Sequence, residues 1–273
     1  MTYFLKSGNR FNVSTQAALD LHDTLPVGTY TVKFDQMAGM FYLEAIEGLS
    51  VASKVYGDTN KTAKRILDTF ADRDGSTGVM LSGEKGSGKT LLAKVLSAHG
   101  QKLGIPTIVI NSPFCGEVFN SFMQMIEQPT IIIFDEFEKV YDNEEQEKLL
   151  TLLDGVYPSK KLFVITTNDK YRVNQHMRNR PGRIFYRLDY TGLEREFIIE
   201  YCEDNLDDKT HIESICRFSM MFNAFNFDML KALVEEMNRY KETPQEAMRM
   251  LNAKPEQDDG SRYKAILNVD GQP

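Results

Sequence analysis

The feature that most constrains the fold of this chain is a glycine-rich loop between a strand pattern and a helix pattern. Residues 83–90 read Gly-Glu-Lys-Gly-Ser-Gly-Lys-Thr, which fits the spacing G-x-x-x-x-G-K-[ST]. The apolar run 78–81 precedes the loop, and apolar residues at 91, 92, 95 and 96 follow it at helical spacing. A loop of this form between a buried strand and a helix indicates an α/β fold.

The residue types of this loop are suited to hold phosphate groups. Its glycines let the backbone curl and point N–H groups inward, and the following helix carries partial positive charge at its N-terminus. Lys89 would reach the β- and γ-phosphates of a nucleoside triphosphate, and Thr90 would place its hydroxyl on Mg²⁺. We therefore expect ATP and Mg²⁺ as ligands. The residues expected to bind the nucleotide are Gly83, Glu84, Lys85, Gly86, Ser87, Gly88, Lys89, Thr90 and Leu91.

Composition narrows the class of protein. Apolar residues make up 42% of the 273 residues and charged residues 26%, an ordinary balance for a soluble globular protein. No apolar run approaches the roughly 20 residues of a membrane span, and the first residues lack the apolar core of a signal peptide. The net charge of −7 disfavours broad binding to nucleic acid. Three cysteines without metal-type spacing, Cys115, Cys202 and Cys216, favour free thiols in a reducing compartment, so we expect a cytoplasmic protein without membrane attachment.

The first 50 residues differ in pattern from the rest. Two strand patterns, 28–34 and 40–46, flank a turn at 36–39, which predicts a β-hairpin. A short helix pattern around 15–22 precedes it. We expect residues 1–50 to form a small N-terminal α+β module.

Strand and helix patterns alternate from residue 51 to 190, and only helix patterns follow. Several strand candidates are apolar on both faces, as buried parallel strands are, so we expect a doubly wound parallel sheet over 51–190. A helical lid is expected over 191–255, with a capping box at 243–246, and a polar tail over 256–273. The strand candidates are 78–82, 107–111, 130–134, 162–166 and 184–188.

Polar residues end two of these strands. Asp135 and Glu136 follow the apolar run 131–134, and Asn168 follows the strand 162–166 after two threonines. Side chains at the carboxyl edge of a parallel sheet reach the nucleotide crevice. Asp135 would hold Mg²⁺ and Glu136 would activate the attacking water, because phosphoryl transfer needs one group on the metal and one on the nucleophile. Asn168 could hold either that water or the γ-phosphate through its amide.

Five blocks in a fixed order give the chain a specific resemblance. They are residues 83–90, 131–136, 149–156, 165–168 and 180–183, the last reading Arg-Pro-Gly-Arg. The chain resembles the AAA+ ATPases over about residues 51–240, and is most similar to the branch of protein unfoldases and the mitochondrial Rieske-protein translocase. The resemblance implies ATP hydrolysis by a ring, a hexamer in this family, whose subunits share active sites.

The resemblance also assigns roles by position. Asn168 matches the family's sensor asparagine, and Arg180 and Arg183 match the two arginines that reach the γ-phosphate of a neighbouring subunit, a task suited to a planar guanidinium. Arg178 is a rival finger, because the stretch before it departs from the family pattern. Tyr56 and Gly57 stand where the family lines its adenine pocket. Residues 226–233 are similar to the family's Gly-Ala-Asp helix start but lack its glycine.

A short aromatic segment bears on what the protein acts on. Phe114, Cys115, Gly116 and Glu117 match the pore loop of the protein-translocating branch in place and type. An aromatic ring there would grip an extended polypeptide by packing, although Phe114 could instead tuck into the core. Remodelling or threading of proteins through a central pore is the first function class. A nucleic-acid-associated ATPase and a nucleotide-dependent assembly switch are the alternatives.

Overall fold

A computed structural model describes residues 2–7, 10–15, 22–154, 159–178, 180–222 and 224–251. The chain divides into two units, which are described separately. Met1–Gly83 and Lys89–Asp189 form the first unit, and Glu84–Gly88 and Tyr190–Pro273 form the second. The expected tail at 256–273 and most of the helix expected near 15–22 lie outside the described residues. Among the described helices, none combines the length and the apolar character needed to cross a bilayer.

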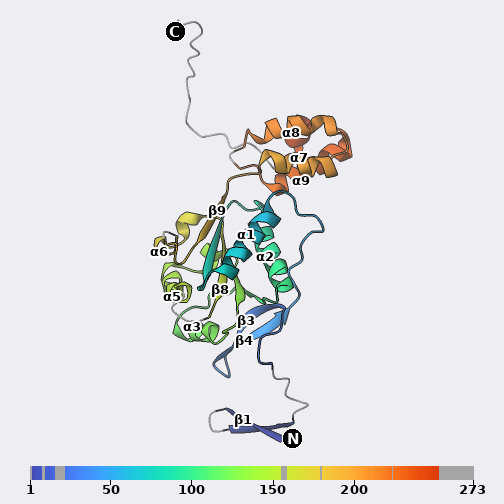
Figure 1. The fold of residues 1–273 in the computed structure, drawn as a ribbon. Helices are drawn as coiled ribbons and strands as arrows, with labels where there is room; N and C mark the ends of the chain where they lie inside the picture. Colours follow the sequence, from blue (N-terminus) through green and yellow to red (C-terminus); the bar gives the residue numbers. More distant parts are fainter. Residues whose placement is uncertain are drawn as a thin grey trace. The chain divides into compact units, whose positions relative to one another are not determined.

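A seven-stranded sheet lies at the centre of the first unit (Figure 1). Strands β3 and β6, β6 and β7, β7 and β8, and β8 and β5 pair in parallel, whereas β3 and β4 pair antiparallel. The strand that leads into the glycine-rich loop, β5, therefore lies between β8 and β9 and not beside the next strand in the chain. The order is β4 (Met40–Ile46), β3 (Thr29–Asp35), β6 (Thr107–Ile110), β7 (Thr130–Phe134), β8 (Lys161–Thr167), β5 (Thr77–Gly83) and β9 (Tyr186–Tyr190).

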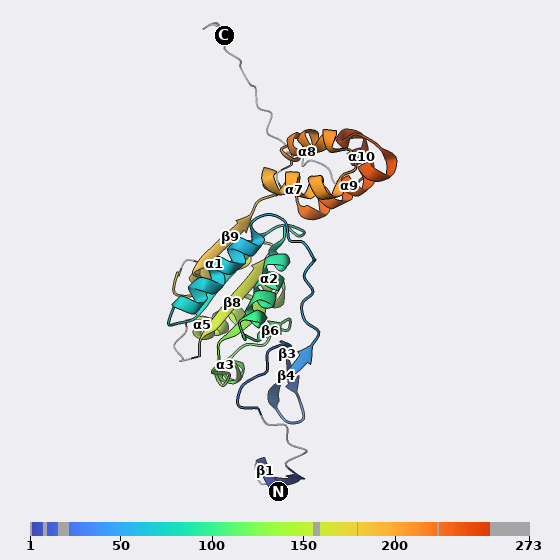
Figure 2. The same cartoon turned by 45° about the vertical axis from the view of Figure 1, so that its right-hand side comes forward.

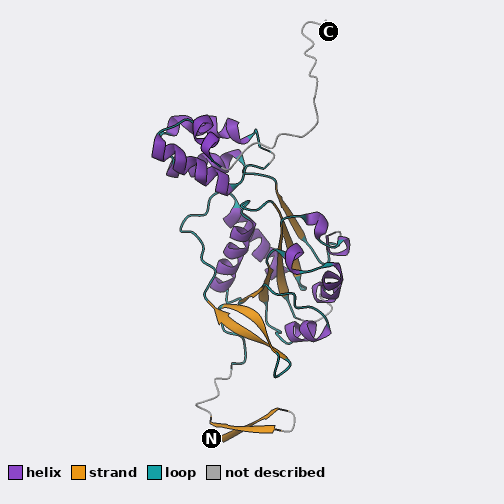
Figure 3. Cartoon of the chain, turned by 180° about the vertical axis from the view of Figure 1, so that it is seen from behind, coloured by secondary structure: helices purple, strands orange, loops and turns teal. Residues whose placement is uncertain are grey.

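Helices cover both faces of this sheet, which confirms the doubly wound α/β prediction. Helices α1 (Thr59–Asp72) and α2 (Lys89–Lys102) pack together on one face, and α3 (Glu117–Gln124) and α5 (Asn143–Leu153) on the other (Figures 1 and 3). Every residue of β7 and β8 is buried as a result. This explains why the central strands are apolar on both faces in the sequence.

The hairpin expected at 28–46 forms, but its two strands belong to the central sheet and not to a separate N-terminal module over 1–50. Strand β3 pairs in parallel with β6, so β3 and β4 extend the central sheet at its edge (Figure 2). Thr29 and Thr31 look solvent-facing in the sequence, yet they are 3% and 5% exposed. The side chain of Gln101 on α2 donates a hydrogen bond to Thr29 Oγ1 at 2.9 Å, so α2 satisfies one of these two buried hydroxyls. The expected boundary at residue 50 is corrected accordingly.

Helices dominate the second unit, as predicted. Apolar residues from α7, α8 and α9, including Ile198, Ile215 and Leu233, are fully buried. The capping box expected at 243–246 is present, with Thr243 as the N-cap of α10 and Pro244 at the first helical position. The helices are α7 (Arg195–Asn205), α8 (Ile212–Ser219), α9 (Phe227–Tyr240) and α10 (Pro244–Met250).

The described N-terminal residues form an antiparallel pair, β1 (Thr2–Ser7) and β2 (Arg10–Thr15), which sequence patterns did not predict. Shorter elements complete the description of the first unit: α4 (Phe137–Val140), α6 (Gln175–Arg178) and the 3₁₀ turn η2 (Lys170–Arg172).

Candidate nucleotide site

The glycine-rich loop runs from the end of β5 to the start of α2, as predicted. Gly86 and Gly88 adopt φ angles of +80° and +98°, a region that other L-residues enter only at a cost of about 1–2 kcal/mol. Lys89 is 7% exposed, and its Nζ donates a hydrogen bond to the carbonyl oxygen of Gly83 at 2.6 Å. The amine of Lys89 therefore binds the first residue of the loop where phosphate groups are expected. Thr90, on the first turn of α2, is exposed.

Within the second unit, the start of α9 holds the apex of this loop. The backbone N–H of Phe227 donates to the carbonyl oxygen of Gly86 at 3.1 Å, and Asn226 Nδ2 donates to the carbonyl oxygen of Lys85 at 3.3 Å. Asn226 also caps α9 by accepting a hydrogen bond from the N–H of Met229 at 2.9 Å. A Cβ on Gly86 would lie 2.6 Å from Asp228 Oδ2, so a larger residue would require the Asp228 side chain to move.

Asp135 and Glu136 lie at the carboxyl end of β7, as predicted. Phe134 pairs with Ile165 of β8, which places Thr166 beside the two acids. The Thr166 hydroxyl donates to Asp135 Oδ1 at 2.6 Å and accepts a hydrogen bond from the N–H of Glu136 at 2.9 Å. Glu136 adopts a left-handed conformation, with φ 49° and ψ 44°, as the N-cap of α4. Thr166 therefore fixes both acids, a role that sequence patterns did not reveal.

The carboxylate of Glu136 lies beside a cation of its own helix. Lys139 Nζ donates to Glu136 Oε1 at 2.6 Å, and both side chains are about half exposed (50% for Lys139 and 45% for Glu136). This hydrogen bond raises the pKa of Lys139. Exposed pairs of this kind contribute little to stability because solvent screens them, so the carboxylate can leave Lys139 for another partner at little cost.

Asn168 follows β8 as predicted, and it is held by an acid that the sequence did not single out. Glu138 Oε1 accepts hydrogen bonds from the backbone N–H of Asn168 at 3.1 Å and from its Nδ2 at 3.0 Å. Glu138 belongs to a run of acids after Glu136 whose sequence suggests a solvated helix face. It is instead 6% exposed, whereas Asp142 and Glu145 of the same run form the capping box of α5.

A second acid joins the neighbouring elements. Asp189 on β9 accepts hydrogen bonds from the hydroxyl of Ser82, at the end of β5, and from Lys170 Nζ, at 2.9 Å, in η2. The hydrogen bond from Ser82 lowers the pKa of Asp189. The residue before the glycine-rich loop and the segment after Asn168 are thus joined through one carboxylate.

The two arginines expected to act on a neighbouring subunit have different surroundings. Arg183 is 8% exposed and pairs with Asp154 through two hydrogen bonds, Nε to Oδ1 at 2.5 Å and Nη2 to Oδ2 at 2.7 Å. Its Nη1 donates to the carbonyl oxygen of His176 at 2.8 Å. The side chain of Arg180 is 63% exposed and approaches Asp154 only at 3.4 Å. Arg178, the rival finger, lies over the ring of Tyr171 at 5.6 Å.

A glycine positions this arginine segment against the sheet. The N–H of Phe185 donates to the carbonyl oxygen of Gly78 in β5 at 2.8 Å. A Cβ on Gly78 would overlap the carbonyl oxygen of Arg183, so no larger residue fits there. The segment 180–185 is therefore anchored to the strand that leads into the glycine-rich loop.

The aromatic ring expected to face a pore is packed inside its own chain. Phe114 is partly buried against the core, and its ring lies 5.1 Å from that of Phe41 on β4 and 6.1 Å from that of Phe119 on α3. The alternative interpretation, a core-packed Phe114, describes this conformation better than a ring free to grip a polypeptide. Cys115 is partly buried next to it, and burial raises the pKa of its thiol. Gly116 has φ +89° and caps α3.

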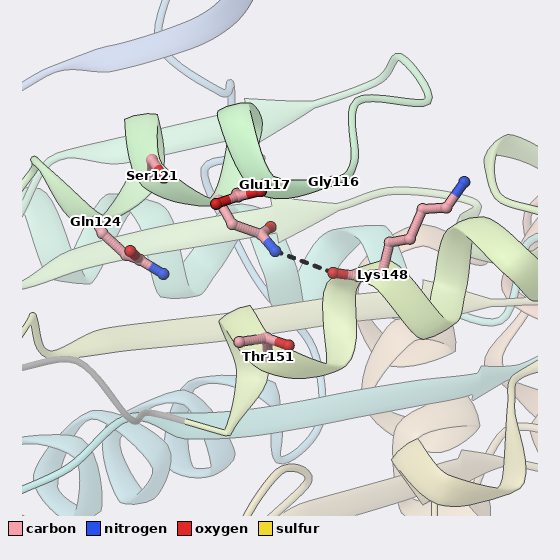
Figure 4. A pocket seen from close by; sticks show the side chains of 7 residues that line it. Gly116, Glu117, Ser121, Gln124, Lys148 and Thr151 are labelled. Atoms are coloured by element: carbon pink, nitrogen blue, oxygen red, sulfur yellow. Dashed lines mark hydrogen bonds between the residues drawn. The ribbon is translucent and has the colours of Figure 1, made fainter.

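A hollow of about 270 Å³ opens beside the predicted pore loop, between α3 and α5 (Figure 4). Its floor includes a hydrogen bond from Asn120 Nδ2 to the carbonyl oxygen of Lys148 at 3.0 Å. Of the residues in the predicted pore loop, Gly116 and Glu117 line it. The lining residues are Gly116, Glu117, Asn120, Ser121, Gln124, Lys148 and Thr151.

Tyr56 and Gly57, expected near adenine, lie in the segment that leads into α1. Gly57 has φ +65°, and Lys54 Nζ lies 4.9 Å from the centre of the Tyr56 ring. An aromatic ring next to a turn offers a surface on which a base could stack. Their role in binding adenine stays a prediction.

The donor groups of the site suit a magnesium-bound triphosphate. The hydroxyl of Thr90 and the carboxylate of Asp135 are hard oxygen donors of the kind that Mg²⁺ prefers. The positive φ angles at Gly86 and Gly88 turn the loop as a phosphate cradle requires. Lys89 and the N-terminus of α2 supply positive charge beside it.

Comparison with known proteins gives matches over the segment that contains these residues. Residues 79–189 match the family described as ATPase family associated with various cellular activities (AAA). The chain is 28% identical to the peroxisomal ATPase PEX1 of Cricetulus griseus over 189 residues, which are 60% of this chain and 14% of that protein. It is 33% identical to the ATPase family gene 2 protein of Saccharomyces cerevisiae over 129 residues, 39% of this chain and 16% of that protein.

A third relative is a proteasome component. The chain is 26% identical to the 26S proteasome regulatory subunit 8 homolog B of Arabidopsis thaliana over 184 residues, 59% of this chain and 40% of that protein. The chain thus spans less than half the length of each of these relatives. The matched family segment runs from β5 to β9 and includes the loop, both acids, Asn168 and the two arginines.

Proposed function

We propose that this chain binds ATP with Mg²⁺ and hydrolyses it, because residues 79–189 match the AAA family of ATPases. The observation that carries the proposal is the convergence of three features at one edge of the sheet. These are the glycine-rich loop after β5, the Asp135–Glu136 pair after β7 and Asn168 after β8. The carboxyl edge of parallel strands is where such sheets bind nucleotides.

Each residue has a role that follows from its chemistry. Backbone N–H groups of residues 84–88 would hold the phosphates, and Lys89 would leave the carbonyl of Gly83 to neutralise phosphate charge. Thr90 and Asp135 would hold Mg²⁺, whose chemistry is to neutralise charge on the phosphate oxygens. Glu136 would accept a hydrogen bond from the attacking water and orient it, after its carboxylate leaves Lys139.

We further propose that the active site is completed by a neighbouring copy of the chain in a ring, which contributes Arg180. Arg180 is exposed, whereas Arg183 is buried in its pair with Asp154. Arg180 is therefore the better candidate for a finger in trans, and Arg183 the better candidate for a residue that holds the Arg180 segment in place. A hexamer is the proposed state, by resemblance to the family.

For the substrate we propose a polypeptide. The acidic net charge of −7 opposes binding to nucleic acid, and one relative is a subunit of the proteasome. Threading would require Phe114 to leave its contacts with Phe41 and Phe119. The three free cysteines are compatible with the cytoplasm, which we propose as the location.

Two variants test the hydrolytic site. Lys89→Ala should lose ATP binding, because the loop then lacks its charge. Glu136→Gln should bind ATP but turn it over at least about 100-fold more slowly. Equilibrium binding of a fluorescent ATP analogue and release of inorganic phosphate measure the two steps. Wild-type turnover by Glu136→Gln would remove Glu136 as the group that activates water.

Mixing two inactive variants tests the shared site. Arg180→Ala supplies an intact loop and Lys89→Ala supplies an intact finger, so mixed rings should regain activity that neither parent has. Arg180→Lys is the matched control, because it keeps the charge and loses the planar fork. A mixture no more active than its parents, under conditions where a ring is seen by electron microscopy, would argue against a finger in trans.

Stimulation of hydrolysis tests the substrate class. An unfolded polypeptide should raise the rate of phosphate release, and single- or double-stranded DNA should leave it unchanged. Stimulation by DNA alone would favour the nucleic-acid alternative. An unchanged rate with both, together with ATP-dependent assembly, would favour the assembly switch.

A further inference from the structure

Glu138 is a buried acid that contacts a predicted active-site residue and has no part in the roles assigned so far. It lies in α4, two residues after Glu136, and is 6% exposed. Its Oε1 accepts both the backbone N–H of Asn168, at 3.1 Å, and the side-chain Nδ2 of Asn168, at 3.0 Å. One oxygen atom therefore fixes the backbone and the side chain of Asn168 together.

This contact determines which way the amide of Asn168 faces. A carboxylate can only accept hydrogen bonds, so the amide nitrogen of Asn168 must be the atom that faces Glu138. Its oxygen, Oδ1, is then turned to the other side of the amide group. Without Glu138 the two orientations, which exchange a donor for an acceptor, would differ less in energy. A water molecule or a phosphate oxygen would then contact the Nδ2 donor of Asn168 in one orientation and the Oδ1 acceptor in the other.

The second carboxylate oxygen of Glu138, Oε2, lowers the stability of the folded chain. Glu138 Oε2 is buried and has no hydrogen-bond partner among the described residues. An unsatisfied buried acceptor reduces stability, and more so when it is charged. An apolar residue would remove that cost but would leave the two N–H donors of Asn168 without their acceptor, so the role of the carboxylate at this position lies in holding Asn168.

The position of Glu138 on α4 links it to the hydrolytic acid. The same short helix carries Glu136 as its N-cap, and Thr166 fixes the backbone of Glu136 to β8, the strand that ends before Asn168. A shift of α4 would therefore move Glu136 and release Asn168 at once.

We propose that Glu138 is a positioning residue for ATP hydrolysis, which holds the amide of Asn168 in the one orientation that serves the water or the γ-phosphate. The proposal rests on the proposed function. Glu138 itself need not touch the nucleotide. Its effect is on the catalytic step and not on the affinity for ATP, because the groups assigned to phosphate binding lie in the loop 83–90.

Three variants separate positioning from structure. Glu138→Leu removes both hydrogen bonds and keeps a branched side chain of roughly similar volume, so we expect kcat to fall about 10- to 100-fold, as for a misplaced catalytic group, with KM changed less than about twofold. Glu138→Gln keeps an acceptor for Asn168 and should retain kcat within about threefold. Glu147→Leu, an exposed acid on α5, is the matched control and should behave as wild type.

Stability and the amide itself provide independent readouts. Thermal unfolding of Glu138→Leu should occur close to the wild-type temperature, because removal of a buried unpaired oxygen offsets the loss of the two hydrogen bonds from Asn168. The side-chain amide signals of Asn168, assigned by nuclear magnetic resonance with an Asn168→Ala reference, should keep their shifts in Glu138→Gln and move in Glu138→Leu.

Distinct outcomes overturn the two proposals. If wild-type protein does not hydrolyse ATP, the proposed function fails and this role fails with it. If wild type hydrolyses ATP and Glu138→Leu matches its kcat, or if its Asn168 amide signals are unchanged, the role of Glu138 alone is overturned. A loss of kcat that follows a loss of folded protein would likewise show that Glu138 is only structural.

Discussion

The pair of Arg183 and Asp154 should contribute measurably to stability, although Arg183 was expected to serve a neighbouring subunit. We consider Arg183→Met, which keeps an unbranched apolar stem and removes the guanidinium. Breaking a buried ion pair by removing one partner costs about 3–5 kcal/mol, and an exposed pair contributes about 0–1 kcal/mol. Arg183 is 9% exposed in its side chain and Asp154 is 26% exposed. An intermediate loss of about 2–3 kcal/mol is therefore expected.

Thermal unfolding followed by circular dichroism measures this loss. A loss of 2–3 kcal/mol corresponds to a fall of about 5–10 °C in Tm for a domain of this size. Arg180→Met is the matched control, because Arg180 is on the same segment with a side chain that is 63% exposed, and its Tm should change by less than about 2 °C. A double-mutant cycle with Asp154→Asn should give a coupling of at least about 1 kcal/mol.

The pH dependence of this effect has a definite sign. The hydrogen bonds from Arg183 lower the pKa of the Asp154 carboxyl from its ordinary value of 3.8. The pair therefore stabilises the folded chain fully above that value, and its contribution is lost as the pH falls through the lowered pKa. The difference in stability between wild type and Arg183→Met should be constant near neutral pH and shrink below about pH 4. Equal Tm values for Arg183→Met and Arg180→Met, or zero coupling in the cycle, would refute the reasoning.

Three further predictions concern other contacts of the first unit. Thr166→Val leaves the N–H of Glu136 without its acceptor and frees Asp135, so the free energy of unfolding should fall by about 1–3 kcal/mol and ATP turnover should drop. Thr166→Ser keeps the hydroxyl and should preserve both stability and turnover. Equal phosphate release by the two variants would contradict this prediction. Lys139→Gln should raise turnover by at most about fivefold, because its solvent-exposed pair with Glu136 is weak. A lower rate would show that Lys139 assists Glu136. Burial lowers the pKa of Lys161 from its ordinary value of 10.5 to about 8. Between these two values the folded chain binds fewer protons than the unfolded chain, so the stability of wild type relative to Lys161→Met should rise with pH across that interval. Urea unfolding at several pH values measures this difference.

Local pattern was sufficient for the central strands and the glycine-rich loop. The runs that became β5, β7 and β8 are apolar on both faces because helices cover both faces of the sheet, and that requirement is written in consecutive residues. The loop is likewise specified by its own glycines and Lys89. The helices of the second unit could be predicted for the same reason, since a capping box such as that of Thr243 and Glu246 lies within four residues.

The edge of the sheet could not be predicted in this way. The pairing of β3 with β6 joins residues far apart in the sequence, such as Thr29 and Thr107. Both threonines are buried, and each meets a polar side chain of α2: Gln101 donates to Thr29, and Ser97 shares a hydrogen bond with Thr107 at 2.8 Å. A polar contact between helix and sheet leaves an alternating pattern in the strand, which is the same pattern that a half-exposed hairpin has.

The acids near the site illustrate the same limit for function. Glu138 and Glu147 belong to one acidic run, and sequence alone gives both the character of a solvated helix face. Glu147 is exposed, but Glu138 is buried because Asn168, thirty residues further on, supplies two donors to its carboxylate. The local signal that distinguishes them is the neighbourhood of Glu138, where Phe137 and Tyr141 are both buried. A charged residue among apolar ones is expensive to bury, so such a residue is a better candidate for an active-site role than the more numerous acids beside it.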